Sequence, residues 1–262
     1  MRLRFTLGLI GSCLLGNEVI AGAWTLPENR GQFISTASRT VAPVKAWFGG
    51  TIDADSNRNQ LFLEYGFWDD LTVGMTVFGD VSTTSDDLEA GLGGHVRHRL
   101  WAEDGSVFSV QAGFTAPIER WLGNGLGDNR PNSATEVDVR VLYGRGWQSE
   151  WGNSFLSSEF GMRVRSEGLE EQLRLDATIG HEPTRGLLLL ASMFTSVPLG
   201  KGDDVSVKFS PSLAYTLWPF LSENEKKPWQ PISPDTVQIG VTWDAASPRS
   251  GLEIGLSIWR SF

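Results

Sequence analysis

Strict alternation of apolar and polar residues recurs along this chain and constrains its fold more than any other feature. In the last eleven residues, LEIGLSIWRSF, one side of the segment is apolar up to Arg260 and the other is mostly small or polar. A period of two is typical of a β-strand with two different faces, and no segment shows convincing helical periodicity. The pattern predicts twelve strands, at 31–41, 59–67, 71–80, 87–100, 106–117, 135–146, 154–165, 170–181, 186–197, 204–217, 235–244 and 251–262.

The apolar face of each predicted strand can pack on a soluble core or face lipid. The longest apolar run beyond the first residues lies near 187–194, too short for a membrane-spanning helix, which needs about 20 residues. The predicted strands have about the 9–11 residues that a tilted strand needs to cross a bilayer, or a few more. Two fold classes therefore remain, a soluble β domain and a transmembrane β-barrel.

The connections between the predicted strands favour the barrel. Tight turns are predicted at 67–70, 101–105, 148–153 and 182–185. Long polar links are predicted at 42–58 and 118–134. Short turns that alternate with longer loops are typical of outer-membrane barrels, whose short turns face the periplasm. The segment 218–234 does not fit this pattern, because it is long but would lie on the periplasmic side.

Tryptophans gather at the strand ends that would lie on the periplasmic side. They are Trp68, Trp101, Trp147, Trp151 and Trp218. Membrane barrels carry an aromatic girdle at such an interface. One hairpin design occurs twice, because Tyr65-Gly66 precedes the first of these tryptophans and Tyr143-Gly144 precedes the third.

The second face of the predicted strands carries charged residues in mid-strand. These lumen-lining candidates are Glu64, Glu89, Arg97, Arg99, Glu136, Asp138, Arg140, Glu159, Arg163, Arg165, Arg174 and Asp176. They form either a network of opposite charges that fills the interior or a polar pore that passes small solutes. Twelve strands lie between about 8, which leave a filled interior, and about 16–18, which leave an open channel. Arginines clustered at a constriction would favour anionic solutes, unless the acidic residues neutralise them.

The beginning of the chain predicts export. Basic residues at 1–4 precede an apolar stretch at 5–15 and the small residues Ala21-Gly22-Ala23, so residues 1–23 are interpreted as a signal peptide and 24–262 as the barrel domain. In a competing interpretation Cys13 carries a lipid, which would require an unusually short leader. Cys13 is the only cysteine, so the processed chain would form no disulfide.

Charge and motif spacing exclude further classes. The chain has 22 Lys and Arg against 31 Asp and Glu, a net charge of −9, which argues against nucleic acid as a partner. Asp53, Asp55, Asn57 and Glu64 have the spacing of a calcium loop, but Arg58 stands where that loop needs glycine. We therefore expect no metal and no cofactor.

The three histidines, His95, His98 and His181, test whether the barrel wall carries a hydrolase. His98, His181 and Ser158 are predicted to face lipid, as the Ser/His pairs of lipid-modifying outer-membrane enzymes do. Both histidines would lie near the periplasm, the wrong side for that chemistry, and no residue supplies the third member of a triad. His95 is predicted to face the lumen and to pair with Glu89 or a neighbour. No catalytic residue is assigned.

The C-terminal segment LEIGLSIWRSF resembles the closing-strand signature of Gram-negative outer-membrane barrels. The matching residues, which would form the assembly signal, are Ile254, Leu256, Ile258 and Phe262. Arg260 departs from the signature, although an arginine near the interface can snorkel. The segments 23–34 and 64–74 are also similar to uncharacterised proteobacterial barrels of the phenol-degradation transporter type. The resemblance implies an outer-membrane location, with membrane lipids and the barrel assembly machinery as partners.

These features together predict one all-β domain, an antiparallel up-and-down transmembrane barrel of about twelve strands. The function expected of it is porin-like, the passive passage of small solutes through a narrow channel. The alternatives are a lipid-modifying hydrolase on the barrel wall and a non-conducting barrel that serves structure or adhesion.

Overall fold

All of the regular structure in the described residues is β-strand. The computed structural model describes residues 22–41, 56–82, 88–118, 134–166, 168–200, 204–217, 236–246 and 252–262. The strands are β1 (Gly31–Val41), β2 (Ser56–Trp68), β3 (Leu71–Ser82), β4 (Leu88–Glu103), β5 (Ser106–Pro117), β6 (Glu136–Ser149), β7 (Gly152–Arg165), β8 (Gln172–Thr184), β9 (Leu187–Pro198), β10 (Ser206–Thr216), β11 (Thr236–Asp244) and β12 (Leu252–Ser261). The twelve predicted strands are thus confirmed, with ends that differ by a few residues. No helix in the described part of the chain is long and apolar enough to cross a membrane.

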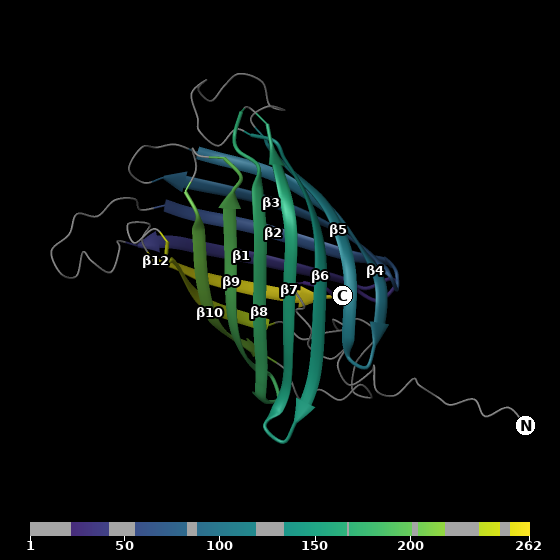
Figure 1. Ribbon diagram of the computed structural model, residues 1–262. Coiled ribbons are helices and arrows are strands. Elements are labelled where there is room, and N and C mark those ends of the chain that lie inside the picture. The colour runs from purple at the N-terminus through teal and green to yellow at the C-terminus, as the bar shows by residue number, and fades with distance from the viewer. Residues whose placement is uncertain are drawn as a thin grey trace, which may run out of the picture.

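The strands close into a single antiparallel barrel. Each strand pairs with its neighbours in sequence, and β12 pairs with β1 to close the sheet, with Gln32 opposite Ser261 and Val41 opposite Leu252. In Figure 1 the front strands, β6 to β9, cross the strands of the wall behind them. A closed barrel has no edge strand, so the backbone groups of every strand can pair within the sheet, as a lipid environment requires.

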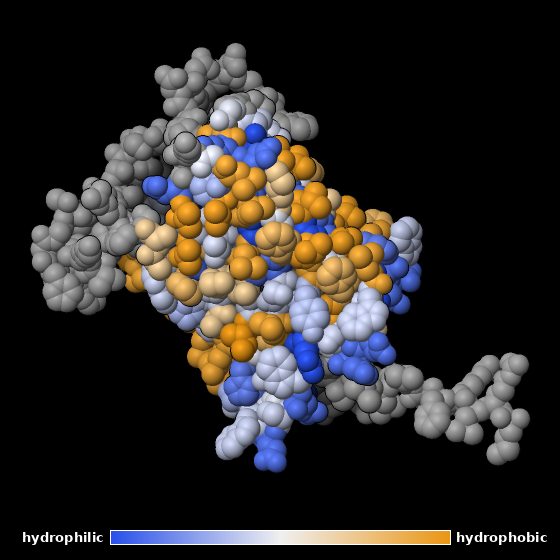
Figure 2. Space-filling view, in the orientation of Figure 1, coloured by the Kyte–Doolittle hydropathy of each residue, from blue (hydrophilic) through white to orange (hydrophobic). Residues whose placement is uncertain are grey.

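The outer face of the barrel is apolar. Val139 is 58% exposed, Ile239 54% and Phe160 52%. Figure 2 shows hydrophobic residues across the middle of the visible wall and hydrophilic residues at its lower end. Soluble proteins rarely expose apolar patches of this extent, whereas a membrane barrel needs such a band against the lipid chains.

The two ends of the barrel differ in how their strands are joined. At one end, called the turn end, two-residue turns at 69–70, 104–105, 150–151 and 185–186 connect β2–β3, β4–β5, β6–β7 and β8–β9. Four predicted girdle residues, Trp68, Trp101, Trp147 and Trp151, are exposed at this end. The opposite end is called the loop end. Trp218, the segment 218–234 and most of the predicted long links lie outside the described residues.

An arginine in the middle of the outer face is expected to destabilise the barrel. Val141 of β6 lies between Val110 and Phe160 on the neighbouring strands and is 41% exposed. Val141→Arg should lower the free energy of unfolding in lipid vesicles by about 2–4 kcal/mol, as measured by urea titration. Val81→Arg, on the outer face at the loop end, is the matched control and should cost about 0–1 kcal/mol. Equal small costs at both positions would contradict a lipid-facing wall.

Candidate functional site in the lumen

A layer of buried side chains lines the inner face of the barrel. It consists of Gln32, Glu64, Thr72, Arg97, Ser109, Leu142, Ser157, Asp176, Thr216 and Ser257, one from each of ten strands. None of these side chains is more than 8% exposed. Nearly all of them are polar, so the interior is held by hydrogen bonds and ion pairs rather than by an apolar core.

The chain that precedes β1 lies inside this layer. We call residues 22–27 the internal segment. Ala23 is fully buried and packs with Val107 of β5 and Leu142 of β6, and Trp24 covers this small apolar cluster. The internal segment therefore occupies part of the lumen beside β5 and β6.

Hydrogen bonds fix the internal segment to three neighbouring strands, β3, β4 and β5. The Ser109 hydroxyl donates to the Ala23 carbonyl, Arg97 Nη1 donates to the Trp24 carbonyl at 2.9 Å, and the Leu26 amide donates to Thr72 Oγ1 at 2.7 Å. The backbone of the segment is thus bound at three successive points, which holds it in one position across the lumen.

Two inner-face glycines provide the space that the internal segment occupies. A Cβ atom on Gly144 would lie 2.6 Å from the Trp24 ring, and a Cβ atom on Gly66 would overlap the Pro27 carbonyl oxygen. These are the glycines of the two Tyr-Gly pairs in the sequence. The repeated hairpin design therefore puts a tyrosine on the outer face and leaves a gap on the inner face for the internal segment.

A buried cluster surrounds Glu64 of β2, whose side chain is 1% exposed. Its Oε1 atom lies 2.9 Å from Arg97 Nη2 and 2.9 Å from His95 Nε2. Its Oε2 atom accepts a hydrogen bond from Gln32 Nε2 at 2.6 Å. Arg97 Nε donates to Gln111 Oε1 at 3.0 Å. Because Arg97 also binds the Trp24 carbonyl, this cluster connects the barrel wall to the internal segment.

A second group of charges, here called the charge network, lies on β6, β7 and β8. Its members are Glu136, Asp138, Arg140, Glu159, Arg163, Arg174 and Asp176. Arg140 is at its centre, 2.7 Å from Asp138, 2.9 Å from Glu159 and 3.0 Å from Asp176. Arg163 pairs with Glu136 and Arg174 pairs with Asp176, each at 3.0 Å.

The structure brings nine of the twelve lumen-lining candidates into these two groups. Arg165 lies outside them, and its Nε atom donates to the Glu170 carbonyl at 2.7 Å. Arg99 lies in β4 where a register shift precedes Trp101. The side chain of Glu89 is outside the described residues, and the partner of His95 is Glu64.

Hydroxyl groups line part of the inner face of the remaining strands, beside the inward-facing Leu188, Leu190 and Phe194 of β9. The paired groups are Thr36 with Ser257 at 2.9 Å, Thr178 with Ser192 at 2.9 Å, Thr242 with Ser210 at 2.8 Å and Thr216 with Thr236 at 3.1 Å. On the described inner face of β9 to β12 and β1, the charged residues are Lys208, Asp244 and Glu253. The lumen thus has a charged wall and, across from it, what we call the hydroxyl wall.

Ser158 is not paired with either of the two lipid-facing histidines. His181 Nδ1 lies 2.9 Å from the Ser154 hydroxyl on the outer face, whereas Ser158 lies opposite Tyr143 and Ala177. His98 Nδ1 lies 3.1 Å from a backbone carbonyl of the β2–β3 turn. Among the described residues, no carboxylate contacts His98 or His181, so the structure supplies no orienting group for a triad there.

The residues with calcium-loop spacing are not brought together in the described structure. Asp53 and Asp55 lie outside the described residues. Glu64 is held inside the barrel by Arg97, and Arg58 pairs with Asp80 at 3.0 Å.

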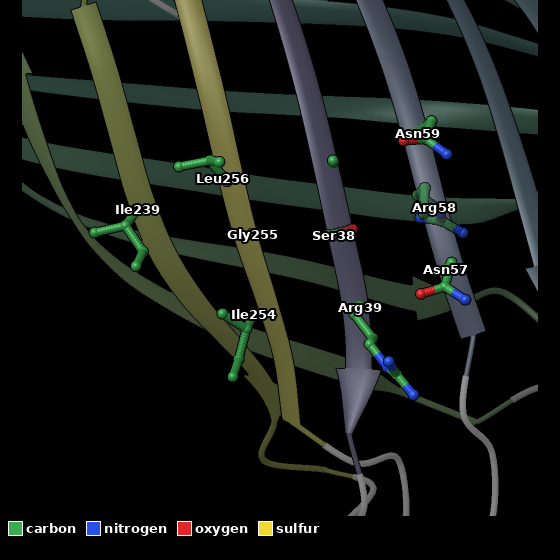
Figure 3. Close-up of a pocket in the computed structure, with 10 residues that line it drawn as sticks. Ser38, Arg39, Asn57, Arg58, Asn59, Ile239, Ile254, Gly255 and Leu256 are labelled. Carbon is green, nitrogen blue, oxygen red and sulfur yellow. The ribbon is translucent and has the colours of Figure 1, made fainter.

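A groove of about 450 Å³ lies where the sheet closes, between β11, β12, β1 and β2 (Figure 3). Ile239, Ile254 and Leu256 lie on one side of it, and Arg39 and Asn57 lie on the other. Because the pairing of β12 with β11 and β1 puts these side chains on the outer face, the groove belongs to the wall and not to the lumen.

The end of the chain completes the sheet. The amide and carbonyl of Phe262 both form 2.9 Å hydrogen bonds with Gly31. Ile254, Leu256 and Ile258 are 42%, 49% and 50% exposed on the outer face. Arg260 is exposed on the same face, opposite Phe33 and near the turn end.

Comparison with known proteins supports the fold. No family model and no curated protein matches the sequence. An outer membrane channel from Pseudomonas putida F1 is similar in structure, with a TM-score of 0.59 and 14% identity over 94% of this chain and 100% of that one. The β domain of the Bordetella autotransporter BrkA gives a TM-score of 0.51 and 12% identity over 90% of this chain and 100% of that one.

The translocator domain of the autotransporter NalP from Neisseria meningitidis is also similar, with a TM-score of 0.50 and 7% identity over 91% of this chain and 90% of that one. By description the first is an outer membrane channel and the other two are domains of autotransporters. The predicted resemblance to outer-membrane β-barrels is therefore confirmed at the level of the fold.

Proposed function

We propose that this barrel is a narrow passive channel of the outer membrane for small polar solutes. The observation that supports the proposal best is the hydroxyl wall. Its side chains, among them Ser192, Ser210 and Thr242, are partly exposed, whereas the layer around Glu64 and Arg97 is buried. This partial exposure supports a polar path beside the filled part of the lumen, inside a wall whose outer face is apolar.

The ion pairs of the lumen favour weak ion selectivity. Arg140 contacts three carboxylates and Arg97 contacts Glu64, so these arginines are neutralised where they lie. A ring of arginines selects anions only when their charge is available to the solute. We therefore propose neutral polar or zwitterionic solutes in preference to anions.

Single-channel recording in planar bilayers tests this proposal. The purified barrel should give small stepwise openings with similar permeability to potassium and chloride. Thr242→Trp, on the inner face of β11, should lower the conductance several-fold, whereas Val241→Trp, the next residue on the outer face, should not. A silent barrel that hydrolyses neither phospholipid nor lipopolysaccharide would overturn the proposal in favour of a structural role, and hydrolysis would favour the wall enzyme.

We also propose that the C-terminal strand is read by the barrel assembly machinery. Phe262→Ala should lower the amount of folded barrel in the outer membrane several-fold, because the terminal aromatic of the signature is lost. Ser261→Ala, one residue earlier on the inner face, is the control. Refolding of both variants from urea into detergent needs no machinery and should proceed as in the wild type. A refolding defect of Phe262→Ala equal to its defect in cells would instead assign Phe262 a role in packing against Gly31.

A further inference from the structure

We propose that export processing cuts this chain after Ala21 and that the new α-ammonium group of Gly22 joins the charge network. The cut lies two residues before the position expected from the sequence. The inference rests on the proposed function, because a channel of the outer membrane must be exported. Four features of the described residues carry it, namely the burial of Ala23, the backbone of Gly22, the surroundings of Ser157 and the charges of the network.

Ala23 belongs to the folded interior. It is fully buried between Val107 and Leu142, and its carbonyl accepts the hydrogen bond of the buried Ser109 hydroxyl. A cut before Trp24 would remove Ala23, leave a hole in this cluster and deprive Ser109 of its acceptor. Ala21 offers signal peptidase a small residue before the cut as well as Ala23 does.

Gly22 holds the start of the internal segment against β7. Its φ angle is 119°, a backbone conformation that glycine adopts far more readily than other residues. A Cβ atom on Gly22 would overlap Ser157 Oγ and would lie 3.7 Å from Glu159 Oε1. The Gly22 nitrogen is within about 2.5 Å of that Cβ position, because both atoms are bonded to the same Cα. The nitrogen therefore lies within about 4.4 Å of Ser157 Oγ and about 6.2 Å of Glu159 Oε1, so both side chains are near the start of the internal segment.

Ser157 has a polar atom that needs a partner. The residue is 3% exposed, and its buried hydroxyl oxygen has no hydrogen-bond partner among the described residues. Buried hydroxyl groups are nearly always hydrogen-bonded. The ammonium group of a processed Gly22 has three N–H donors, which suffice for Ser157 Oγ and a Glu159 carboxylate oxygen together.

Glu159 shares its cation in the charge network. Arg140 contacts Glu159 at 2.9 Å, and it also contacts Asp138 and Asp176. Charges removed from water need partners, and an α-ammonium group beside Glu159 would give this carboxylate a second cation.

The position of the cut can be read directly. The full chain is produced in a Gram-negative host, isolated from the outer membrane and examined by intact-mass spectrometry and N-terminal sequencing. The expected sequence is Gly-Ala-Trp-Thr. A mature chain that begins Trp-Thr-Leu-Pro, or one that begins with a lipid-modified Cys13, would overturn the proposal.

The position of the amine is tested by acylation of the folded barrel, with the N-terminal peptide quantified by mass spectrometry. In the wild type the α-amine should react at least about tenfold more slowly than in the urea-unfolded chain, since acylation needs local opening. Glu159→Gln should raise the rate in the folded barrel several-fold. Glu253→Gln, which removes an inner-face carboxylate from the hydroxyl wall, should not change it. Equal rates in folded and unfolded wild type would refute the assignment.

These results do not depend on conductance. A barrel that begins at Gly22 but does not conduct would contradict the proposed channel and support this inference. A conducting barrel that begins at Trp24 would do the reverse.

Discussion

Glu64→Gln is expected to lower the free energy of unfolding by about 3–5 kcal/mol, because it leaves Arg97 as a buried charge without its counter-ion. The Glu64 side chain is 1% exposed and that of Arg97 6%, so water cannot take the place of the carboxylate at low cost. Glutamine keeps the size of the side chain and can still contact Gln32. The loss is therefore assigned to charge rather than to packing. The measurement is a urea titration of the barrel in detergent, followed by tryptophan fluorescence.

A double variant and a control isolate the ion pair. Glu64→Gln with Arg97→Gln removes both charges and should recover much of the lost stability, since a buried pair is often replaceable by neutral groups of similar size. Glu253→Gln removes a carboxylate that accepts from Ser38 at 2.5 Å on the opposite wall, and should cost about 1 kcal/mol. If the double variant were no more stable than Glu64→Gln alone, the Glu64–Arg97 pair would not be the source of the loss.

The fold was predictable because every strand of a barrel wall separates the same two environments. Lipid outside and a polar lumen inside impose a period of two on each strand, and that period is visible in the sequence. Even the closing strand follows it, with Ile254, Leu256 and Ile258 outside and Trp259 inside, where Trp259 is 6% exposed. Register and closure do not follow from alternation, because they depend on which strands meet.

The site was predictable in part for the same physical reason. Whether a charged residue faces the lumen follows from its place in the alternating pattern of its strand. Which residue it pairs with depends on how the neighbouring strands are aligned. His95 was expected to pair with Glu89 or a neighbour, and it meets Glu64 two strands away. The internal segment was missed altogether. Its one sequence signal was the repeated Tyr-Gly pair, whose glycines are spaced to admit Trp24 and Pro27.

The internal segment narrows the lumen without taking part in the sheet. It packs against one side of the barrel, through the apolar cluster at Ala23, and its Trp24 ring meets Phe155 of β7 edge-on with centroids 6.1 Å apart. β1 begins only at Gly31, and the Asn29 amide already bonds to the Gly66 carbonyl at 2.9 Å. The barrel wall is thus anchored from Asn29 onward, so the residues before it can be removed without removing a strand.

A chain in which the leader is joined directly to Asn29 should fold, and its single-channel conductance should rise several-fold because the Trp24 ring no longer fills the lumen. Its free energy of unfolding should fall by about 2–4 kcal/mol, since the packing of Ala23 and Trp24 is lost. Trp24→Ala should also raise the conductance, but by a smaller factor. Trp151→Ala, which removes a girdle tryptophan that is 79% exposed, should leave conductance unchanged. If the shortened barrel folds and conducts like the wild type, the solute path runs along the hydroxyl wall alone and the internal segment serves only to stabilise the charged wall.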